Sequence, residues 1–186
     1  MKKIFLYFIY LIILIFSILP IFFISIILLI TQGTPIIFWS ERVGKNKKLF
    51  KMPKFRSMKK NVPMIATHLL EQPESKVTVV GKVLRKYSLD ELPQFISVIF
   101  GKMSIIGPRP ALSSQIKLIQ KRKDYGIHLF KPGITGHAQV NGRDNLNMDE
   151  KVFLEFEYLN NKSFLTDFLI LIKTIKIIFK NKDISH

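Results

Sequence analysis

The sequence predicts an α+β protein in which an N-terminal membrane helix is followed by one compact domain. Two observations predict this class. From Ile4 to Ile30 every residue is apolar or aromatic except two serines and one proline, a length sufficient for a bilayer whose hydrocarbon core is roughly 30 Å thick. The rest of the 186-residue chain mixes strand-like alternation with helix-like apolar spacing, and its length of about 150 residues is ordinary for one domain. We therefore expect a membrane segment at residues 1–33 and a single domain at 34–186.

The composition limits the partners and the chemistry. The formal net charge is +16 and the pI is near 10.1, so the expected partners are anions: lipid headgroups, phosphorylated small molecules or nucleic acid. The chain has no cysteine, which excludes disulfides, cysteine-ligated zinc and thiol nucleophiles and suits a reducing cytoplasm. Its four histidines have no metal-binding spacing. A metal in this protein would therefore be a hard ion held by oxygen ligands.

The N-terminal apolar run contains a single proline. Pro20 removes a backbone hydrogen bond and predicts a kink, and the Ser17 hydroxyl is placed to satisfy a freed group. A secretory signal is a poor interpretation, because the run is too long and no small-residue cleavage site follows it.

Basic residues flank this run on both sides: Lys2 and Lys3, then Arg42, Lys45, Lys47, Lys48, Lys51, Lys54, Arg56, Lys59 and Lys60. The positive-inside rule places both flanks in the cytoplasm. A helix bent at Pro20 that enters and leaves by one face meets this requirement, whereas a straight spanning helix does not. A plain spanning anchor is the alternative, since Lys2 and Lys3 are only two charges.

Turn-forming residues at 31–35 end the helix. Residues 36–40 then predict a strand or an interfacial segment, with Trp39 at the depth where aromatic belts lie in membrane proteins.

A turn at 43–46 leads into two stretches, 48–52 and 54–58, that alternate basic and apolar residues as a half-buried strand does. This alternation places Lys54 and Arg56 on one face. A solvated edge strand guarded by charge is the alternative explanation.

Helices are expected in the middle of the chain. Residues 61–75 have no clean period and predict a loop around a short helix, whereas 77–87 become helical. A second apolar helix follows at 94–100 and is stopped by Gly101.

The C-terminal stretch 164–180 predicts an amphipathic helix. Its apolar residues have helical spacing: Phe164, Phe168, Leu171, Ile172, Ile175, Ile178 and Phe179. Lys173, Lys176 and Lys180 lie along another face, a pattern typical of helices that lie in the interface of an anionic membrane. A helix that caps the core of the domain has the same pattern.

Two adjacent carboxylates, Asp90 and Glu91, lie between apolar residues in a chain that is otherwise strongly basic. A helix start is the alternative explanation, with Ser88 as N-cap and Glu91 completing a capping box. Pro93 weakens that alternative, because it would fall at the fifth helical position, where its ring and missing N–H disturb a helix. The pair is therefore a candidate catalytic centre.

Two further loops combine rigidity with ligand-binding groups. Arg109 lies between two prolines, and a guanidinium on a stiff backbone suits bidentate contact with phosphate, although a rigid surface loop explains the same residues. Residues 131–136 form a glycine-containing turn that lets the backbone approach a ligand. Asn141-Gly142 is a hairpin signal first, and His137 alone is more often structural than catalytic.

Taken in order, these stretches resemble the bacterial sugar transferase family, the small monotopic phosphoglycosyl transferases. The resemblance rests on Pro20 in the apolar helix and on the stretches at 31–33, 54–58, 88–94, 107–110, 132–136 and 139–143. It implies a re-entrant membrane helix and a compact cytoplasmic α/β domain carried on interfacial amphipathic helices. It also implies transfer of a sugar phosphate from a UDP-sugar to polyprenyl (undecaprenyl) phosphate, with release of UMP, on the cytoplasmic face of the inner membrane.

The same resemblance assigns roles to individual residues. Asp90 matches the family's nucleophilic aspartate, and Glu91 matches its magnesium-binding glutamate. A carboxylate that attacks a diphosphate meets like charge, so the chemistry calls for Mg²⁺ and fixed cations. The candidate cations are Lys54, Arg56, Arg85, Arg109 and Arg143.

The chain departs from the family's pattern at three places. Leu19 stands before Pro20 where the family often has serine, His137 stands where tryptophan is common, and Met52-Pro53 interrupts the expected strand. These departures bear on the bend of the helix, one packing contact and the strand register.

Two other functions are compatible with parts of the sequence. A membrane-tethered basic protein would bind anionic lipid or nucleic acid, but the basic residues form no recognition helix or aromatic platform, so we expect no nucleic-acid partner. A Mg²⁺-dependent nucleotide-diphosphate hydrolase would use the same acidic pair. Release of UMP only in the presence of polyprenyl phosphate distinguishes the transferase from the hydrolase.

Overall fold

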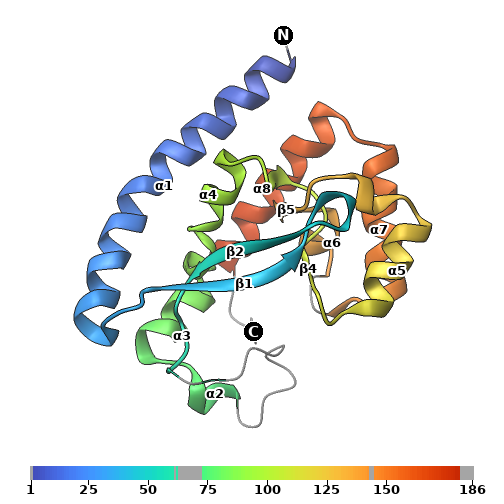
Figure 1. Ribbon diagram of the computed structural model, residues 1–186. Coiled ribbons are helices and arrows are strands. Elements are labelled where there is room, and N and C mark those ends of the chain that lie inside the picture. The colour runs from blue at the N-terminus through green and yellow to red at the C-terminus, as the bar shows by residue number, and fades with distance from the viewer. Residues whose placement is uncertain (1, 61, 63–72, 143–144, 181–186) are drawn as a thin grey trace.

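The computed structural model describes residues 2–60, 62, 73–142 and 145–180, and Figure 1 shows their arrangement. A three-stranded antiparallel sheet has the order β2-β1-β4, and a separate parallel pair joins β3 to β5. The strand bounds are β1 (Ile37–Val43), β2 (Leu49–Phe55), β3 (Ser104–Ile106), β4 (Ala111–Leu112) and β5 (Gly133–Thr135). The mixed sheet and helix content confirms the α+β class.

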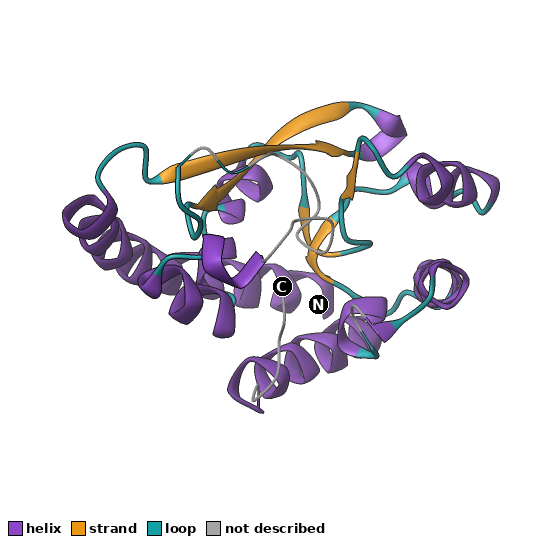
Figure 2. Ribbon diagram, turned by 90° about the horizontal axis from the view of Figure 1, so that it is seen from below, coloured by secondary structure: helices purple, strands orange, loops and turns teal. Residues whose placement is uncertain are grey.

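The helices surround these strands. Their bounds are α1 (Lys2–Gln32), α2 (Pro73–Lys76), α3 (Val79–Lys86), α4 (Gln94–Ile99), α5 (Ile116–Asp124), α6 (His137–Val140), α7 (Met148–Asn160) and α8 (Phe164–Lys180). Short 3₁₀ turns occupy Lys45–Lys47, Leu89–Glu91 and Ile127–Leu129. In Figure 2 the strands lie together on one side of the molecule, and the two longest helices, α1 and α8, lie on the other.

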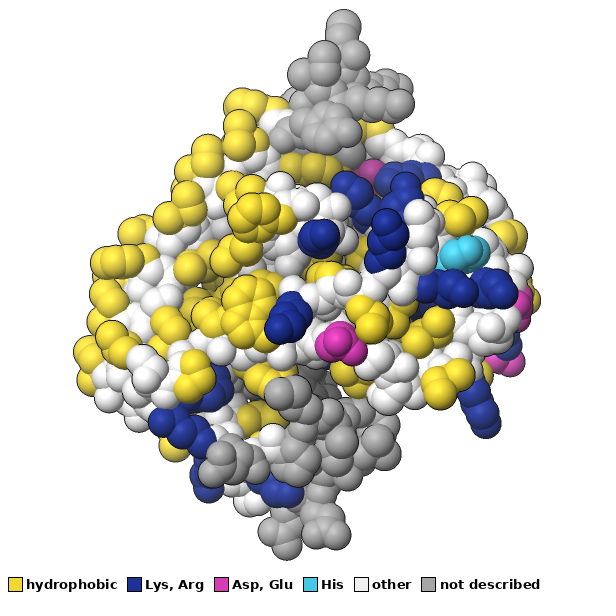
Figure 3. All heavy atoms as spheres, viewed as in Figure 1, with side chains coloured by type: hydrophobic (Ala, Val, Ile, Leu, Met, Phe, Trp, Pro, Cys, Tyr) yellow, Lys and Arg dark blue, Asp and Glu magenta, His cyan; other side chains and the backbone are white. Residues whose placement is uncertain are grey.

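Helix α1 forms where the apolar run predicts a membrane segment. Within the described residues, Phe8–Gln32 is the one stretch of helix long and apolar enough to cross a bilayer. Figure 3 shows hydrophobic side chains over the edge of the molecule that α1 occupies. Pro20 lies inside the continuous helix and leaves the carbonyl of Phe16 without its usual donor. The Ser17 hydroxyl donates to the carbonyl of Leu14 at 2.6 Å, so the expectation that Ser17 compensates for Pro20 was wrong.

Both halves of α1 pack against the rest of the protein. The N-terminal half contacts the core cluster formed by Phe95, Ile105, Ile106, Tyr158, Ile170 and Leu171, through Ile9, Tyr10, Ile13 and Leu14. The C-terminal half contributes Ile24 and Leu28 to a second cluster with Phe55 and Leu84. The helix is therefore held to the domain at two separate places along its length.

The predicted helices at 77–87, 94–100 and 164–180 are confirmed. Helix α3 begins after Thr78, whose hydroxyl accepts a hydrogen bond from the Gly81 N–H, and α4 is followed by Gly101 in the left-handed region. Helix α8 packs on the core as a helix that caps the domain does, through the buried residues Ile170 and Leu171. Ile175 and Phe179, one and two turns further along from Leu171, are exposed. Contact of α8 with a membrane surface stays a prediction.

The first strand pair is more regular than the sequence suggested. Strand β2 continues through Pro53, which pairs with Trp39 of β1. A proline is tolerated there because β2 lies at the edge of its sheet. Met52-Pro53 therefore does not interrupt the strand.

Other expectations were wrong or lie outside the described residues. Asn141-Gly142 forms no hairpin: the two residues follow the end of α6, and the next helix or strand in the described chain is α7. Most of the predicted loop at 61–75 lies outside the described residues. Helices α5 and α7 were not predicted, and α7 begins with a capping box formed by Asn147 and Glu150.

Candidate active site

The acidic pair lies in the 3₁₀ turn Leu89–Glu91, called η3, which joins α3 to α4. Ser88 has a left-handed backbone (φ 54°) and its side chain caps no N–H, so the capping-box explanation was wrong. Pro93 occupies the N-cap position of α4, where its missing N–H disturbs no helical hydrogen bond. Asp90 and Glu91 are only 7% and 8% exposed. Buried carboxylates are rare unless they are paired or functional.

Glu91 is held by two cations from distant parts of the chain. Lys54 Nζ lies 2.7 Å from Oε1, Arg109 Nη2 lies 2.7 Å from the same oxygen, and Arg109 Nη1 lies 3.3 Å from Oε2. Burial alone would raise the pKa of Glu91, but the charges and hydrogen bonds of Arg109 and Lys54 hold it well below its usual value. Glu91 is therefore ionised at neutral pH, and both of its oxygens accept hydrogen bonds.

Asp90 has a different environment. Its Oδ1 is buried and has no hydrogen-bond partner among the described residues. Burial raises the pKa of Asp90, the charge of Lys54 opposes the rise, and the charge of Glu91 adds to it. A carboxylate oxygen with an unshared lone pair and raised basicity is a candidate nucleophile.

Arg42 belongs to this cluster, although sequence analysis named it only as one basic residue among many. It projects from β1 on the same face as Lys54 of β2, because Phe38 pairs with Lys54 and side chains alternate along a strand. Its Nη1 donates to the carbonyl of Pro110 at 3.2 Å, and its Nε donates to Ser40 Oγ at 3.0 Å. Burial and the nearby charge of Arg109 lower the pKa of Arg42 to about 10, so the side chain stays charged at neutral pH.

The signal for Arg42 was the alternation of polar residues at Ser40 and Arg42, but the predicted strand ended at residue 40 and left Arg42 outside it. The carbonyl contact matters because it joins the first strand to the rigid loop that carries Arg109.

The remaining predicted cations do not all gather at the carboxylates. Arg85 donates from Nε to Ser57 Oγ at 3.0 Å, and its charge lowers the pKa of Asp90. Arg56 instead donates from Nη2 to the carbonyls of Gln32 and Gly33 at the end of α1. Lys54 and Arg56 therefore contact different partners, Glu91 and the end of α1, and do not form one ligand-binding face. Arg143 lies outside the described residues.

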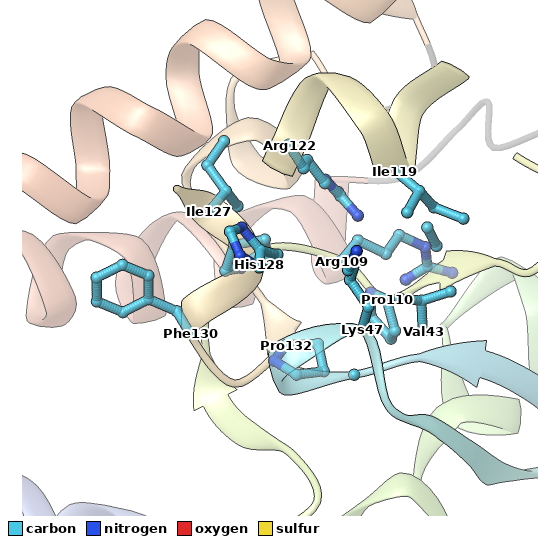
Figure 4. Close-up of a pocket in the computed structure, with 13 residues that line it drawn as sticks. Val43, Lys47, Arg109, Pro110, Ile119, Arg122, Ile127, His128, Phe130 and Pro132 are labelled. Atoms are coloured by element: carbon cyan, nitrogen blue, oxygen red, sulfur yellow. The ribbon is translucent and has the colours of Figure 1, made fainter. Parts of the chain in front are cut away.

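A solvent-open pocket adjoins the cluster on the far side of Arg109 (Figure 4). Prolines 108, 110 and 132 and the side chains of Ile119, Ile127 and Phe130 form apolar walls. Lys47, Arg109, Arg122 and His128 supply the polar groups, and Arg122 is paired with Glu155 at 2.8 Å. The pocket therefore combines apolar surface with positive charge beside the catalytic candidates, but its volume of about 30 Å³ is that of a single water molecule, so it is too small to hold a nucleotide in this conformation.

The described residues contain no group of three or more histidine, cysteine or acidic side chains that would hold a metal unaided. Mg²⁺ is commonly bound by one or two carboxylates together with substrate phosphate oxygens. Asp90 and Glu91 supply that number of carboxylates, so the residues fit a metal that arrives with a phosphorylated substrate.

Comparison with known proteins gives a consistent result. The family model described as bacterial sugar transferase matches residues 1–181. The chain is 36% identical over 164 residues to the undecaprenyl-phosphate galactose phosphotransferase of Salmonella typhimurium, covering 80% of this chain and 34% of that protein. It is 35% identical over 160 residues to the exopolysaccharide production protein ExoY of Sinorhizobium fredii, covering 78% of this chain and 70% of that protein.

A third relative is named for another sugar. The chain is 37% identical over 159 residues to the UDP-N-acetylgalactosamine-undecaprenyl-phosphate N-acetylgalactosaminephosphotransferase of Aeromonas hydrophila, covering 83% of this chain and 38% of that protein. The chain thus spans about a third of the length of the Salmonella and Aeromonas relatives and 70% of ExoY.

Proposed function

Because this chain belongs to the bacterial sugar transferase family, we propose that it transfers a sugar 1-phosphate from a UDP-sugar to undecaprenyl phosphate and releases UMP. Such a reaction would begin the assembly of a surface glycan on its lipid carrier. The relatives named for transfer to undecaprenyl phosphate support this substrate class. The strongest structural support is the contrast within the acidic pair, where Glu91 is held by cations and Asp90 keeps an unpartnered oxygen.

The first step uses Asp90 as the nucleophile. One carboxylate oxygen attacks the β-phosphorus of the UDP-sugar and forms a new P–O bond. The P–O bond to the α-phosphate breaks, and UMP leaves with the bonding electron pair. The product is an acyl phosphate that carries the sugar, and covalent catalysis of this kind divides one difficult displacement into two.

The second step transfers the phosphosugar to the lipid. An anionic phosphate oxygen of undecaprenyl phosphate attacks the same phosphorus, and the acyl-phosphate P–O bond breaks. Asp90 regains its carboxylate, and the lipid carries a sugar diphosphate. The raised pKa of Asp90 favours bond formation to phosphorus, because a more basic carboxylate is the stronger nucleophile.

The surrounding cations reduce the repulsion between a carboxylate and a diphosphate. Lys54 and Arg109 lie at Glu91, Arg42 lies behind Arg109, and the charge of Arg85 reaches Asp90. Fixed charges in a buried site stabilise a phosphoryl transition state because they need no reorganisation during the reaction. We assign these four residues to the phosphate groups of the donor.

Mg²⁺ is the proposed cofactor, with Glu91 as its principal ligand. When bound, the ion would neutralise phosphate charge and stabilise the leaving UMP. Because the oxygens of Glu91 are engaged by Lys54 and Arg109, those two cations must turn toward the donor phosphates before Glu91 can hold a metal.

We place the protein on the cytoplasmic face of the inner membrane, with α1 entering and leaving by that face. A spanning helix would carry its N-terminal half across the bilayer and away from the domain, but Ile9–Leu14 and Ile24–Leu28 both pack against it. The exposed apolar residues of α8, among them Ile175 and Phe179, suit contact with the same membrane surface.

A cysteine at Lys3 tests this topology, since the chain has no cysteine of its own. A membrane-impermeant maleimide should fail to label intact cells and should label the residue after lysis. Strong labelling of intact cells would mean that α1 spans. A cysteine at Lys51, on the exposed side of the domain, provides the cytoplasmic control.

The function itself is tested with membranes that contain the protein and a panel of UDP-sugars. UMP should accumulate over many turnovers only when undecaprenyl phosphate is present. Sustained UMP release without the lipid would favour the hydrolase, and no turnover of any UDP-sugar would favour a tethered binding protein. The panel also identifies the sugar.

A further inference from the structure

Arg56 makes a contact that the catalytic role does not require. Its side chain is only 9% exposed, and Nη2 donates to the carbonyl of Gln32 at 2.7 Å and to the carbonyl of Gly33 at 2.9 Å. Gln32 is the last residue of α1. The backbone N–H of Arg56 donates to the carbonyl of Ile36 at 2.8 Å. One residue thus holds the end of the membrane helix and the segment that leaves it.

This contact places a positive charge at the negative end of the α1 dipole, an arrangement that stabilises a helix end. The guanidinium has no carboxylate partner among the described residues, and its Nη1 is buried without a hydrogen-bond partner. Burial of a charged group is unfavourable unless it is well compensated. Two carbonyls compensate it only in part, so stability alone does not account for an arginine at this position.

The strand end that carries Arg56 also carries contacts to the active site. Lys54, two residues earlier, donates to Glu91 at 2.7 Å. Phe55 packs with Leu28 of α1 in one core cluster. Ser57, which follows Arg56 in the chain, accepts a hydrogen bond from Arg85 at 3.0 Å. Four consecutive residues therefore connect the end of α1 to two cations of the catalytic cluster.

We infer that Arg56 is a positioning residue. It sets the distance of the catalytic cluster from the C-terminal end of α1, and thereby the height of the cluster above the membrane. Two strand residues span about 6.6 Å, so the contact of Arg56 fixes Lys54 at a short and constant distance from Gly33. This inference rests on the proposed function, because it concerns delivery of a membrane-bound acceptor to the site.

The two substrates depend on this height to different degrees. A UDP-sugar is soluble and reaches the cluster from water, whereas the phosphate of a polyprenyl lipid is confined to the level of the headgroups. A shift of the cluster relative to α1 therefore affects transfer to the lipid and leaves attack on the donor unchanged. A residue that contacts donor phosphate would affect both steps.

Arg56→Gln tests the inference in the full-length protein in vesicles of undecaprenyl phosphate and phospholipid. Formation of the phosphosugar adduct on Asp90 from UDP-sugar alone should stay within about twofold of wild type. Transfer to undecaprenyl phosphate should fall roughly tenfold or more, the scale of one buried charge-assisted hydrogen bond. Arg56→Lys, which keeps a charge at the end of α1, should recover part of the loss. Lys51→Gln, which removes an exposed charge from β2, the strand that precedes Arg56, is the matched control and should change neither step.

Trp39 supplies a measurement that does not depend on activity. It is the only tryptophan in the chain, it is 50% exposed, and it pairs with Pro53 beside the strand end under study. Lipids brominated at different chain depths should quench Trp39 fluorescence in wild type with a maximum at one depth. In Arg56→Gln that maximum should shift or broaden.

The outcomes separate this inference from the proposed function. Equal loss of both chemical steps in Arg56→Gln, or no loss with an unchanged quenching profile, would overturn the positioning role. Absence of UMP release by the wild type with every UDP-sugar would overturn the proposed function instead, while the quenching experiment would still test the connection between Arg56 and α1.

Discussion

Replacement of Arg109 by methionine tests whether the cation cluster acts on phosphate. Arg109 reaches Glu91 with both terminal nitrogens, at 2.7 and 3.3 Å. Glu91 would keep its contact with Lys54 at 2.7 Å, so the variant leaves no buried carboxylate without a cation. The fold should therefore survive, and the effect should appear in catalysis.

The size of the effect follows from the charge and exposure of Arg109. A unit charge about 4 Å from a developing charge is worth about 4 kcal/mol at an effective dielectric constant near 20. The loss of one preorganised donor in an oxyanion site costs about 2.7–4 kcal/mol. The Arg109 side chain is 31% exposed, so solvent screening reduces the effect. We expect a loss of about 2–3 kcal/mol, which corresponds to a fall in kcat/KM of roughly 30- to 160-fold.

The assay is UMP release from the preferred UDP-sugar with saturating undecaprenyl phosphate. Arg109→Lys keeps the charge but lacks the two-pronged geometry, and it should recover only part of the activity. Lys102→Met, in the turn after α4, is a control for the loss of one exposed positive charge. If Arg109→Met retains kcat/KM within threefold of wild type and is normally folded, Arg109 does not stabilise the transition state.

Three further predictions concern the carboxylates and Lys54. Asp90→Asn should fold with unchanged or higher thermal stability, because it removes a buried charge with an unpartnered oxygen, yet mass spectrometry should find no phosphosugar adduct and no UMP should form. Lys54→Met removes a charge that lowers the pKa of Asp90, so Asp90 should ionise only at higher pH and the acid limb of the donor-step rate should move upward; an unmoved limb would contradict the assignment. Glu91→Gln should raise the Mg²⁺ concentration needed after EDTA treatment or abolish activity, whereas an unchanged metal titration would direct attention to Asp144, which lies outside the described residues.

Local patterns were sufficient for several elements. Helix α8 has the predicted bounds of 164–180, because a long apolar period without glycine or proline has few other solutions. The acidic pair was singled out because two carboxylates in a strongly basic chain have a high electrostatic contrast with their surroundings. The position of Arg109 between two prolines likewise predicted a guanidinium on a stiff backbone, and in the structure this guanidinium contacts Glu91.

Long-range contacts were beyond the reach of those patterns. Lys54 is 37 residues from Glu91 in sequence, and its neighbour Arg56 has the same charge and the same spacing signal but contacts α1 instead. Which partner each side chain meets depends on where η3 and the end of α1 pack around it, and local spacing does not encode that tertiary packing. Arg42 was missed for a related reason, since its carbonyl partner Pro110 is 68 residues away. The hairpin signal at Asn141-Gly142 failed because α6 precedes it where a strand was needed.

The geometry of η3 explains how neighbouring residues acquire different environments. A 3₁₀ turn has three residues per turn, so the side chains of Asp90 and Glu91 project about 120° apart. Glu91 thereby meets Lys54 and Arg109, while Asp90 keeps a buried oxygen without a partner. These opposite environments suit the proposed division of the pair into a metal ligand, Glu91, and a nucleophile, Asp90.

The pairing of the cations with Glu91 also bears on the proposed function. Buried positive charges with no counterion would be costly, and under the proposed function a diphosphate substrate would be present only part of the time. Glu91 serves as their partner in the free protein, where Lys54 and Arg109 each lie 2.7 Å from its Oε1. In the proposed reaction, donor phosphate would replace Glu91 as their partner, and Mg²⁺ would then compensate the buried carboxylate that is released. The buried ion pairs would thus keep the empty site folded, and their exchange for phosphate would link binding of the metal to binding of the nucleotide.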